Sequence, residues 1–479
     1  MRMVSRSLIL PLIVSALPVL SGCPDRDVSA VDPNQSKEQQ KEIPVSLNRD
    51  IDILFLVDNS GSMRQEQESL ANNFPRFIDV LESIEGGLPN VHIGVISSNV
   101  GTGPVGGGGE ACGGNGDNGN LIVRDGCPAL TDGAKFISDV VVDEETGTRE
   151  FNYSGDLAAQ FSCMAQLGTT GCGFEQHLES MKRALDPSNS NNAGFLRDDA
   201  YLAFITVQDE DDCSTTTAGR EMFDPSQDSR DAPLGELSSF RCFEFGTTCD
   251  QTAERATGPR TGCQPGDDDT AYMTGVEPYV ERLKALKPDP GRVIVAAISA
   301  PAEPVSVSLD PDRNQLRVDP ACVVCPDGSA TGCPLDPGAD GAALVAAAPA
   351  IRLRSFLDQF PQRGTWQSLC AYNPAIGDVD LSGALVQIAS SLGKLPSSFC
   401  LQGDLALPLE CSVFEITNPD TSAETQTFIP PCDDAAPTCY RIEEDGSCVT
   451  PSNLTLDIVR EGPRPTDPTE ISVRCLLDI

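Results

Sequence analysis

An apolar run gives way abruptly to small polar residues in the stretch ILFLVDNSGS, residues 53–62. Its five consecutive apolar residues, 53–57, are typical of a strand buried on both faces of a parallel sheet. Asp58, Ser60 and Ser62 then occupy alternate positions of the turn that follows. Open α/β sheets bind their ligands beyond the carboxyl ends of the strands. The stretch therefore predicts a central strand followed directly by a functional turn.

Apolar runs and amphipathic segments alternate from residue 51 to residue 393. Runs of strand length lie at 51–57, 91–97, 201–207, 293–299 and 365–371. Apolar residues recur at the spacing of a helical face in 70–84, 174–185, 276–286 and 381–392. This alternation predicts an α/β fold with a doubly wound, mostly parallel sheet and helices on both faces.

Segments that contain cysteines interrupt and follow this pattern. The interruptions are 101–165, 211–270 and 301–341, and we interpret them as disulfide-rich insertions. The Gly-rich run in the first of them lacks the Gly-Lys-Ser or Gly-Lys-Thr of a phosphate cradle, so an exposed loop is expected. Residues 396–479 contain six cysteines, which predicts a small Cys-rich β module at the carboxyl terminus.

The composition indicates an exported, acidic chain with many loops. Among 479 residues there are 42 Gly, 37 Pro and 19 Cys. Disulfides stabilise loop-rich chains and persist in oxidising compartments. The formal net charge is −38, whereas phosphate binding needs clustered Lys and Arg. Nucleic acid is therefore excluded as an expected partner.

Residues 1–22 have the organisation of a signal peptide, with two arginines, an apolar run too short to span a membrane, and small residues at the end. The sequence Leu-Ser-Gly-Cys that ends at Cys23 resembles a bacterial lipobox, which implies cleavage before Cys23 and lipidation of its thiol. Lipidation leaves 19 − 1 = 18 cysteines, which can close nine bridges without a spare thiol. The alternative is an ordinary signal peptide with Cys23 free or bridged.

The residues after the lipobox suggest where the protein resides. Residues 23–48 are polar and charged without apolar periodicity, as in a flexible tether. Pro24 does not resemble the Asp that marks lipoproteins for the inner membrane. We therefore expect a lipid-anchored protein of the bacterial cell envelope, at the outer rather than the inner membrane, facing the periplasm or the cell surface.

The Asp-x-Ser-x-Ser pattern that begins at Asp58 resembles the metal-ion-dependent adhesion site of the von Willebrand factor type A family. The resemblance covers residues 49–395, leaves out the carboxyl-terminal module, and implies a bacterial lipoprotein with such a domain. In that family, a Thr before a helix and an Asp after a buried strand complete the site. Thr169 and Asp209 match these positions, with Thr170 as the alternative to Thr169 because a Gly-Cys-Gly insertion alters the usual spacing.

The resemblance implies one bound divalent cation, Mg²⁺ first, with Mn²⁺ or Ca²⁺ as alternatives. Its implied ligands are Asp58, Ser60, Ser62, Thr169 and Asp209. Hard divalent cations prefer such oxygen ligands. Two carboxylates leave the charge of the ion partly uncompensated, which favours an acidic group on the partner. The alternative is that these side chains only cap turns and helices.

Two further groups of residues have a structural and a metal-binding interpretation. The acidic runs 209–212 and 267–269 are either solvated loops, which we favour, or a second cation site. Cys322, Cys325, Cys333 and Cys370 are either a zinc or redox site or, as an exported chain favours, disulfides. Proximity in the sequence suggests the pairs Cys112–Cys127 and Cys163–Cys172. The second pair would restrain the loop that carries Thr169.

The sequence gives no support for catalysis. Neither a Gly-x-Ser-x-Gly elbow nor a His-Glu-x-x-His motif is present. Of the two histidines, His92 is expected to pack within a strand and His177 to lie on a helix surface. We therefore expect a membrane-anchored adhesion or binding protein rather than an enzyme, with no small-molecule substrate, that grips a protein or polysaccharide through an exposed acidic group. The alternative is a structural envelope lipoprotein in which the ion only stabilises the fold and the insertions or the carboxyl-terminal module bind.

Overall fold

The computed structural model of the chain describes most of residues 50–392 and the strands on either side of that region. The described residues are 43–46, 50–83, 87–392 without 144–145, 199, 252–254, 267–271, 288–289, 311–312, 336–338 and 362, and 398–401, 411–418, 424–432, 436–444, 454–460 and 469–475. The expected signal peptide, the lipidation site Cys23 and most of the expected tether lie outside these residues. No helix within the described residues is long and apolar enough to cross a membrane.

A seven-stranded sheet forms the centre of the molecule, in the order β15-β10-β6-β2-β3-β4-β5. Its members are β2 (Asp50–Val57), β3 (Asn90–Ser97), β4 (Ile137–Asp143), β5 (Thr148–Phe151), β6 (Tyr201–Val207), β10 (Val293–Ser299) and β15 (Gly364–Ser368). The first five strands in this order pair in parallel, and β4 and β5 are antiparallel. All five predicted strands are present, so the predicted α/β class with a mostly parallel sheet is confirmed.

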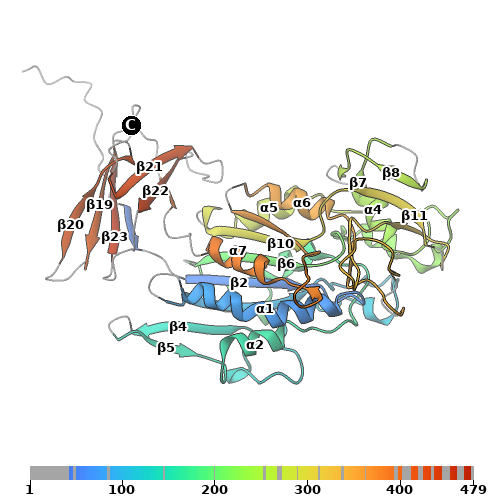
Figure 1. Ribbon diagram of the computed structural model, residues 1–479, viewed down its shortest axis with the longest axis horizontal. Helices are drawn as coiled ribbons and strands as arrows, with labels where there is room; N and C mark the ends of the chain where they lie inside the picture. Colours follow the sequence, from blue (N-terminus) through green and yellow to red (C-terminus); the bar gives the residue numbers. More distant parts are fainter. Residues whose placement is uncertain are drawn as a thin grey trace, which may run out of the picture.

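Helices pack against both faces of this sheet (Figure 1). The core on one face includes residues of α1 (Arg64–Glu82), α2 (Leu157–Met164) and α7 (Ser382–Leu392). The core on the other face includes residues of α3 (His177–Ala184), α5 (Glu277–Lys284) and α6 (Ile351–Asp358). Strand β2 supplies Ile53 and Phe55 to the first core and Leu54 and Leu56 to the second. Its apolar run is continuous because both of its faces are buried.

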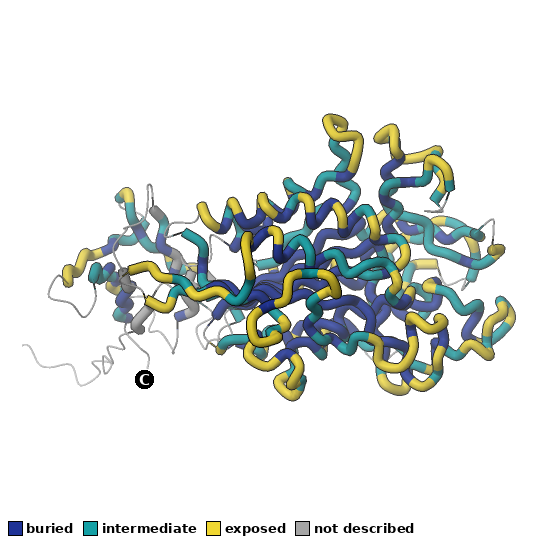
Figure 2. The backbone as a smooth tube through the Cα atoms, turned by 90° about the horizontal axis from the view of Figure 1, so that it is seen from below, coloured by how far each residue is buried: buried dark blue, intermediate teal, exposed yellow. Residues whose placement is uncertain are grey.

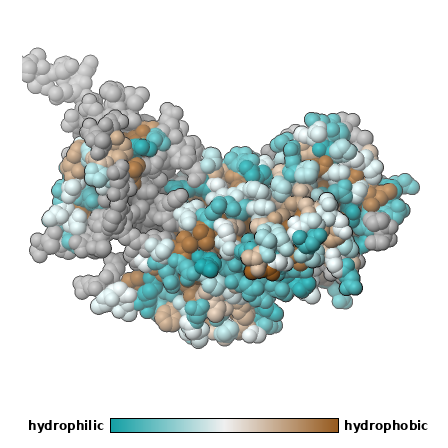
Figure 3. Space-filling view, viewed as in Figure 1, coloured by the Kyte–Doolittle hydropathy of each residue, from teal (hydrophilic) through white to brown (hydrophobic). Residues whose placement is uncertain are grey.

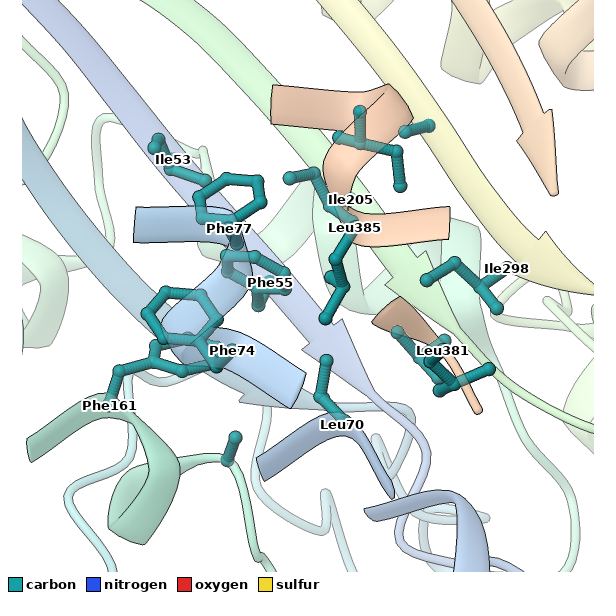
Figure 4. Close-up of a cluster of buried hydrophobic side chains, with 14 of the residues drawn as sticks. Ile53, Phe55, Leu70, Phe74, Phe77, Phe161, Ile205, Ile298, Leu381 and Leu385 are labelled. Carbon is teal, nitrogen blue, oxygen red and sulfur yellow. The ribbon is translucent and has the colours of Figure 1, made fainter. Parts of the chain in front are cut away.

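Phenylalanines fill the first core (Figure 4). Phe55 of β2 has ring centroids 5.8 Å from Phe74 and 5.7 Å from Phe77, both on α1. Phe161 of α2 lies 4.6 Å from Phe55 and stacks on Phe74. These contacts pack the middle of α1, together with α2, against β2. Figure 2 shows the strands as the buried centre of the molecule, with exposed loops around them. On the face drawn in Figure 3, the hydrophobic residues form only small, separate patches.

The insertions contain more regular structure than the sequence indicated. Segment 101–165 supplies α2 and the β4–β5 hairpin, which extends the central sheet at its edge. These elements were missed because only one face of β4 is well buried, which leaves a weak apolar pattern. The two later insertions contain α4 (Phe240–Gly246), β7 (Thr247–Thr248), β8 (Gly258–Arg260), β9 (Gln264–Pro265), β11 (Val305–Leu309), β12 (Leu316–Val318) and β13 (Cys322–Val324). The short strands β14 (Val345–Ala347), β16 (Tyr372–Asn373) and β17 (Asp378–Val379) follow the last of these insertions.

Eight disulfides lie within the described part of the chain, which confirms the predicted bridging. The pairs are Cys112–Cys172, Cys127–Cys163, Cys213–Cys242, Cys249–Cys263, Cys322–Cys370, Cys325–Cys333, Cys411–Cys475 and Cys432–Cys439. The suggested pairs Cys112–Cys127 and Cys163–Cys172 are wrong. The fold instead joins cysteines that are far apart in the sequence, by 60 positions in Cys112–Cys172 and by 36 positions in Cys127–Cys163. Bridges occupy the four cysteines that had a zinc or redox alternative.

The carboxyl-terminal strands form two small sheets, of order β1-β23-β19-β20 and β18-β22-β21. They are β18 (Ser398–Cys400), β19 (Cys411–Thr417), β20 (Thr425–Ile429), β21 (Thr438–Glu444), β22 (Leu454–Arg460) and β23 (Thr469–Cys475). Strand β1 (Ile43–Ser46) pairs antiparallel with β23. This pairing differs from the expected tether over 23–48. Residues Ile43, Pro44 and Val45 pair with residues of β23, but so short a segment does not show the alternating pattern by which a strand is predicted from sequence.

Candidate metal centre

The turns after β2 and β6 leave the same edge of the sheet. Val57 pairs with Val207 in parallel register, and the Asp58 backbone N–H donates to the Val207 carbonyl at 3.0 Å. Asp58 and Asp209 therefore emerge from neighbouring strands, one and two residues past the paired ends. This is the carboxyl edge at which open α/β sheets bind ligands.

The turn after β2 holds Asp58 by one carboxylate oxygen. The Ser60 backbone N–H donates to Asp58 Oδ1 at 2.8 Å, and Ser98 Oγ at the end of β3 donates to the same atom at 3.1 Å. Ser60 Oγ and Ser62 Oγ lie 3.3 Å apart. Asp58 Oδ2 is buried and has no hydrogen-bond partner within the described residues. The turn thus places two hydroxyls next to a carboxylate that has one unpartnered oxygen.

Glycines and Gln67 of α1 join the loop that carries Thr169 to this turn. Gln67 Nε2 donates to the Asp58 carbonyl at 2.7 Å and to the Gly168 carbonyl at 2.9 Å, while its Oε1 accepts from Gly168 N–H at 3.0 Å. The Gly171 N–H donates to the Asn59 carbonyl at 2.7 Å. A Cβ on Gly171 would lie 2.0 Å from Asn59 Oδ1, so only glycine permits this approach. Thr169 lies in the loop between Gly168 and Gly171 and is half-buried.

Asp209 reaches the turn from β6. It is buried, and its carboxyl interacts with the Ser62 side chain, which lowers its pKa slightly against the larger effects of burial and nearby charge. Its Oδ1 has no partner within the described residues, and its carbonyl accepts from Ala348 N–H at 2.7 Å. Burial raises the pKa of the Asp209 carboxyl well above its usual value, and the Asp58 carboxylate raises it further. The loops of Asp58, Thr169 and Asp209 therefore meet at one place.

The structure places further ionisable residues close to this turn, and two of them, Glu66 and Glu175, did not stand out in the sequence. Burial followed by the charge of Asp58 raises the pKa of Glu66 to about 8 and that of Glu210 to about 7. Burial also raises the pKa of Glu175 well above its usual value. His177 is fully buried rather than on a helix surface as expected, with Nε2 3.6 Å from Asp58 Oδ2. Only the acidic first turn of α1 could have indicated Glu66 from the sequence.

The acidic run 209–212 is part of the packed structure, which corrects the prediction of a solvated loop. Asp211 accepts from the backbone N–H groups of Arg352 and Leu353 at the start of α6. Asp212 is 1% exposed, pairs with the Arg352 guanidinium at 3.0 Å and accepts from Leu178 N–H at 3.0 Å. The run 267–269 lies outside the described residues. His92, by contrast, packs within β3 as predicted.

The residues present fit a hard divalent cation. Asp58 Oδ2, Asp209 Oδ1, Glu66 Oε2 and Glu175 Oε1 are buried without hydrogen-bond partners in the described part of the chain. Such oxygens cost free energy unless they are protonated or face a cation. In that same part, no group of three or more His, Cys, Asp and Glu side chains is arranged around a metal position. A cation at this edge would therefore need hydroxyl ligands in addition to the carboxylates.

Comparisons with known proteins show only a distant structural likeness. No family model and no curated protein matches the chain. Among solved structures, the pilus adhesin RrgA from Streptococcus pneumoniae is similar with a TM-score of 0.26 and 10% sequence identity. The match covers 91% of this chain and 58% of the adhesin chain, so this chain corresponds to little more than half of that protein's length.

Proposed function

We propose that the chain is a binding protein of the bacterial cell envelope that grips an acidic group of a partner through a divalent cation. In this proposal residues 49–395 form a doubly wound von Willebrand factor type A domain, and Cys23 carries a lipid anchor. The cation, Mg²⁺ or a similar ion, is held by Asp58, Ser60, Ser62, Thr169 and Asp209. The protein has no catalytic role.

The observation that carries the proposal is the set of unpartnered oxygens at the carboxyl edge of the sheet. Asp58 Oδ2 and Asp209 Oδ1 are both buried without partners. Within the described residues, no lysine or arginine forms an ion pair with either carboxylate. Proteins rarely bury carboxylates in this way without a compensating charge. A bound cation supplies that charge.

Each contact around the proposed ion has a positioning role. Ser60 N–H and Ser98 Oγ fix Asp58 through Oδ1 and leave Oδ2 directed elsewhere. Gln67 fixes the loop of Thr169 through Gly168. The bound cation supplies an electropositive point with an open coordination position for a carboxylate of the partner. The edge of the sheet thereby acts as a preformed recognition site.

The proposal is tested by capture of partners from envelope extracts on the purified chain, with Mg²⁺ or with EDTA. We expect a partner that is retained in Mg²⁺, is released by EDTA, and is lost from Asp58→Asn and Asp209→Asn. Glu68→Gln is the matched control, because Glu68 lies on the exposed side of the same first helix. Retention that does not change with EDTA on folded protein would remove the cation from binding. The alternative, in which the ion only stabilises the fold, would then remain.

A further inference from the structure

A cavity of about 440 Å³ lies where two insertions meet. Its lining consists of Val105, Glu221, Asp224, Gln227, Pro233, Leu234 and Tyr272. Val105 belongs to the Gly-rich segment after β3, whereas the other residues belong to the segment after β6. The two segments touch closely, since a Cβ on Gly107 would lie 1.7 Å from the Phe223 carbonyl oxygen. The volume is within the range of natural ligand sites.

The polar groups that line this cavity are mainly hydrogen-bond acceptors. Glu221 and Asp224 contribute carboxylates, and hydrogen bonds from Ser226 hold the pKa of Asp224 below its usual value. The lining contains no lysine or arginine. A ligand that donates hydrogen bonds and carries positive charge would satisfy these groups.

The remaining walls are apolar and suit an aliphatic stem. Val105, Pro233 and Leu234 provide aliphatic surface, and Tyr272 provides an aromatic ring. Lysine and arginine side chains combine such a stem with a charged end group, and their charges interact favourably with aromatic faces. The mixture of carboxylates and apolar walls therefore matches a basic side chain better than a purely polar cation.

Buried contacts restrain the segment that lines the cavity. Arg241 is fully buried and donates to the carbonyls of Met222, Gln227, Gly235 and Glu236, so its guanidinium is occupied by the backbone. The Cys213–Cys242 disulfide holds the neighbouring residue. Phe223 and Tyr272 pack in a hydrophobic cluster that also contains Cys112 and Cys172. A site fixed in this way loses little entropy when a ligand binds.

We infer that this cavity binds a lysine or arginine side chain of a partner polypeptide. The site goes beyond the proposed cation site, because none of its lining residues is a proposed ligand of the ion. The Cys112–Cys172 bridge nevertheless connects the Gly-rich segment to the loop of Thr169.

The test uses a short blocked peptide with one arginine and a matched peptide with citrulline, which has the same shape without the charge. Binding is measured by calorimetry and ligand-observed NMR at low salt in EDTA. We expect the arginine peptide to bind at least tenfold more tightly than the citrulline peptide. The double variant Glu221→Gln/Asp224→Asn should lose this preference, since asparagine still accepts from Ser226. Glu150→Gln, an exposed acid on β5, is the control and should bind like the wild type.

Three results would overturn the inference. They are no binding of the arginine peptide to folded wild-type protein, equal binding of both peptides, and unchanged affinity in the double variant. Tighter binding of spermidine than of the arginine peptide would assign the cavity to a free polyamine instead. Because EDTA is present throughout, these failures leave the cation proposal untouched. Loss of cation binding in Asp58→Asn would likewise leave this cavity untouched.

Discussion

The two ends of the central sheet each bury an aspartate next to a histidine, but the two pairs differ in their hydrogen-bond partners. At the amino end, His92 Nδ1 lies 3.6 Å from Asp52 Oδ1, and at the carboxyl end, His177 Nε2 lies 3.6 Å from Asp58 Oδ2. Asp52 accepts from Arg197 N–H at 2.7 Å and from Arg197 Nε at 2.8 Å. At the carboxyl end, Asp58 Oδ2 and both ring nitrogens of His177 have no hydrogen-bond partner among the described residues.

This contrast separates a structural network from a candidate ligand site. Lys287 also lies 3.8 Å from Asp52, and His92 Nδ1 is 2.8 Å from the Phe195 carbonyl. Burial raises the pKa of Asp52, and its contacts with Arg197 oppose that rise. The amino-end network is thus completed by the chain itself. The carboxyl-end cluster is buried without a lysine or arginine partner among the described residues, so its carboxyls are either protonated or, as proposed, face a bound cation.

Removal of a charge from the completed network should have the largest effect. Asp52→Ala leaves the buried Lys287 and part of Arg197 without a counter-charge, and we expect a loss of about 3–5 kcal/mol in the free energy of unfolding. Urea unfolding in EDTA measures this loss. Asp58→Asn under the same conditions should retain or gain stability, because it removes one charge from a repelling cluster. Equal losses in both variants would erase the contrast between the two ends.

The next largest effect should come from added Mg²⁺. An ion that binds only the folded chain stabilises it by about 2.7 kcal/mol at one hundred times its dissociation constant. We expect a stabilisation of this order in the wild type and none in Asp209→Asn. Thermal unfolding over a Mg²⁺ concentration series measures it. A wild-type melting temperature independent of Mg²⁺ would contradict this expectation, and an equal response of the variant would place the ion elsewhere.

A smaller effect should follow from the titration of His92. Burial lowers the pKa of His92 from 6.5 to about 4, with Asp52, Asp50 and Arg197 as its charged neighbours. Between these values the unfolded chain binds the proton and the folded chain does not, so stability falls as the pH falls from 6.5 to 4. We expect the free energy of unfolding to fall by about 2 kcal/mol over this pH range. The raised pKa of Asp52 offsets part of the loss that the His92 shift alone would cause.

The variant His92→Gln isolates this contribution, since glutamine can still donate to the Phe195 carbonyl but does not titrate. Urea unfolding at pH 7 and pH 4.5 in EDTA should show a smaller decrease in stability for the variant than for the wild type. If stability falls by the same amount in the variant and in the wild type, the titration of His92 does not cause the fall.

The smallest effect should come from an exposed ion pair. Arg64 and Glu68 lie 3.5 Å apart with more than half of each side chain exposed. Exposed pairs of this kind contribute about 0.5 kcal/mol or less. Glu68→Gln should therefore change the free energy of unfolding by no more than that, in Mg²⁺ or EDTA. A large change would show that charge near α1 affects the free energy of unfolding even where the side chain is exposed.

The sequence predicted the sheet because its central strands are apolar on both faces. Residues 51–57, 91–97, 201–207 and 293–299 coincide almost residue for residue with β2, β3, β6 and β10. The β4–β5 hairpin was missed because an edge strand with one well-buried face has a weak pattern. The disulfide partners were wrong because pairing depends on which loops the topology brings together, and separation in the sequence carries no such information.

The candidate site was predicted only in its motif residues. Asp58 and Asp209 could be placed because each follows an apolar strand, and parallel strands bring their carboxyl ends to one edge. Glu175 and His177 could not, because charged residues are normally exposed and only tertiary packing shows that these are buried. Glu66 had only its place in the first turn of α1 to indicate it. The cavity between the insertions was equally invisible, since it depends on how two long loops meet.

The central claim is tested most directly by anomalous diffraction from crystals of the chain soaked in Mn²⁺. The account predicts one strong peak at the carboxyl edge of the sheet, within coordination distance of oxygen atoms from the turns of Asp58, Thr169 and Asp209. It predicts no such peak in Asp58→Asn crystals. A wild-type map without density at this edge, or with Mn²⁺ bound only at other surfaces, would contradict it.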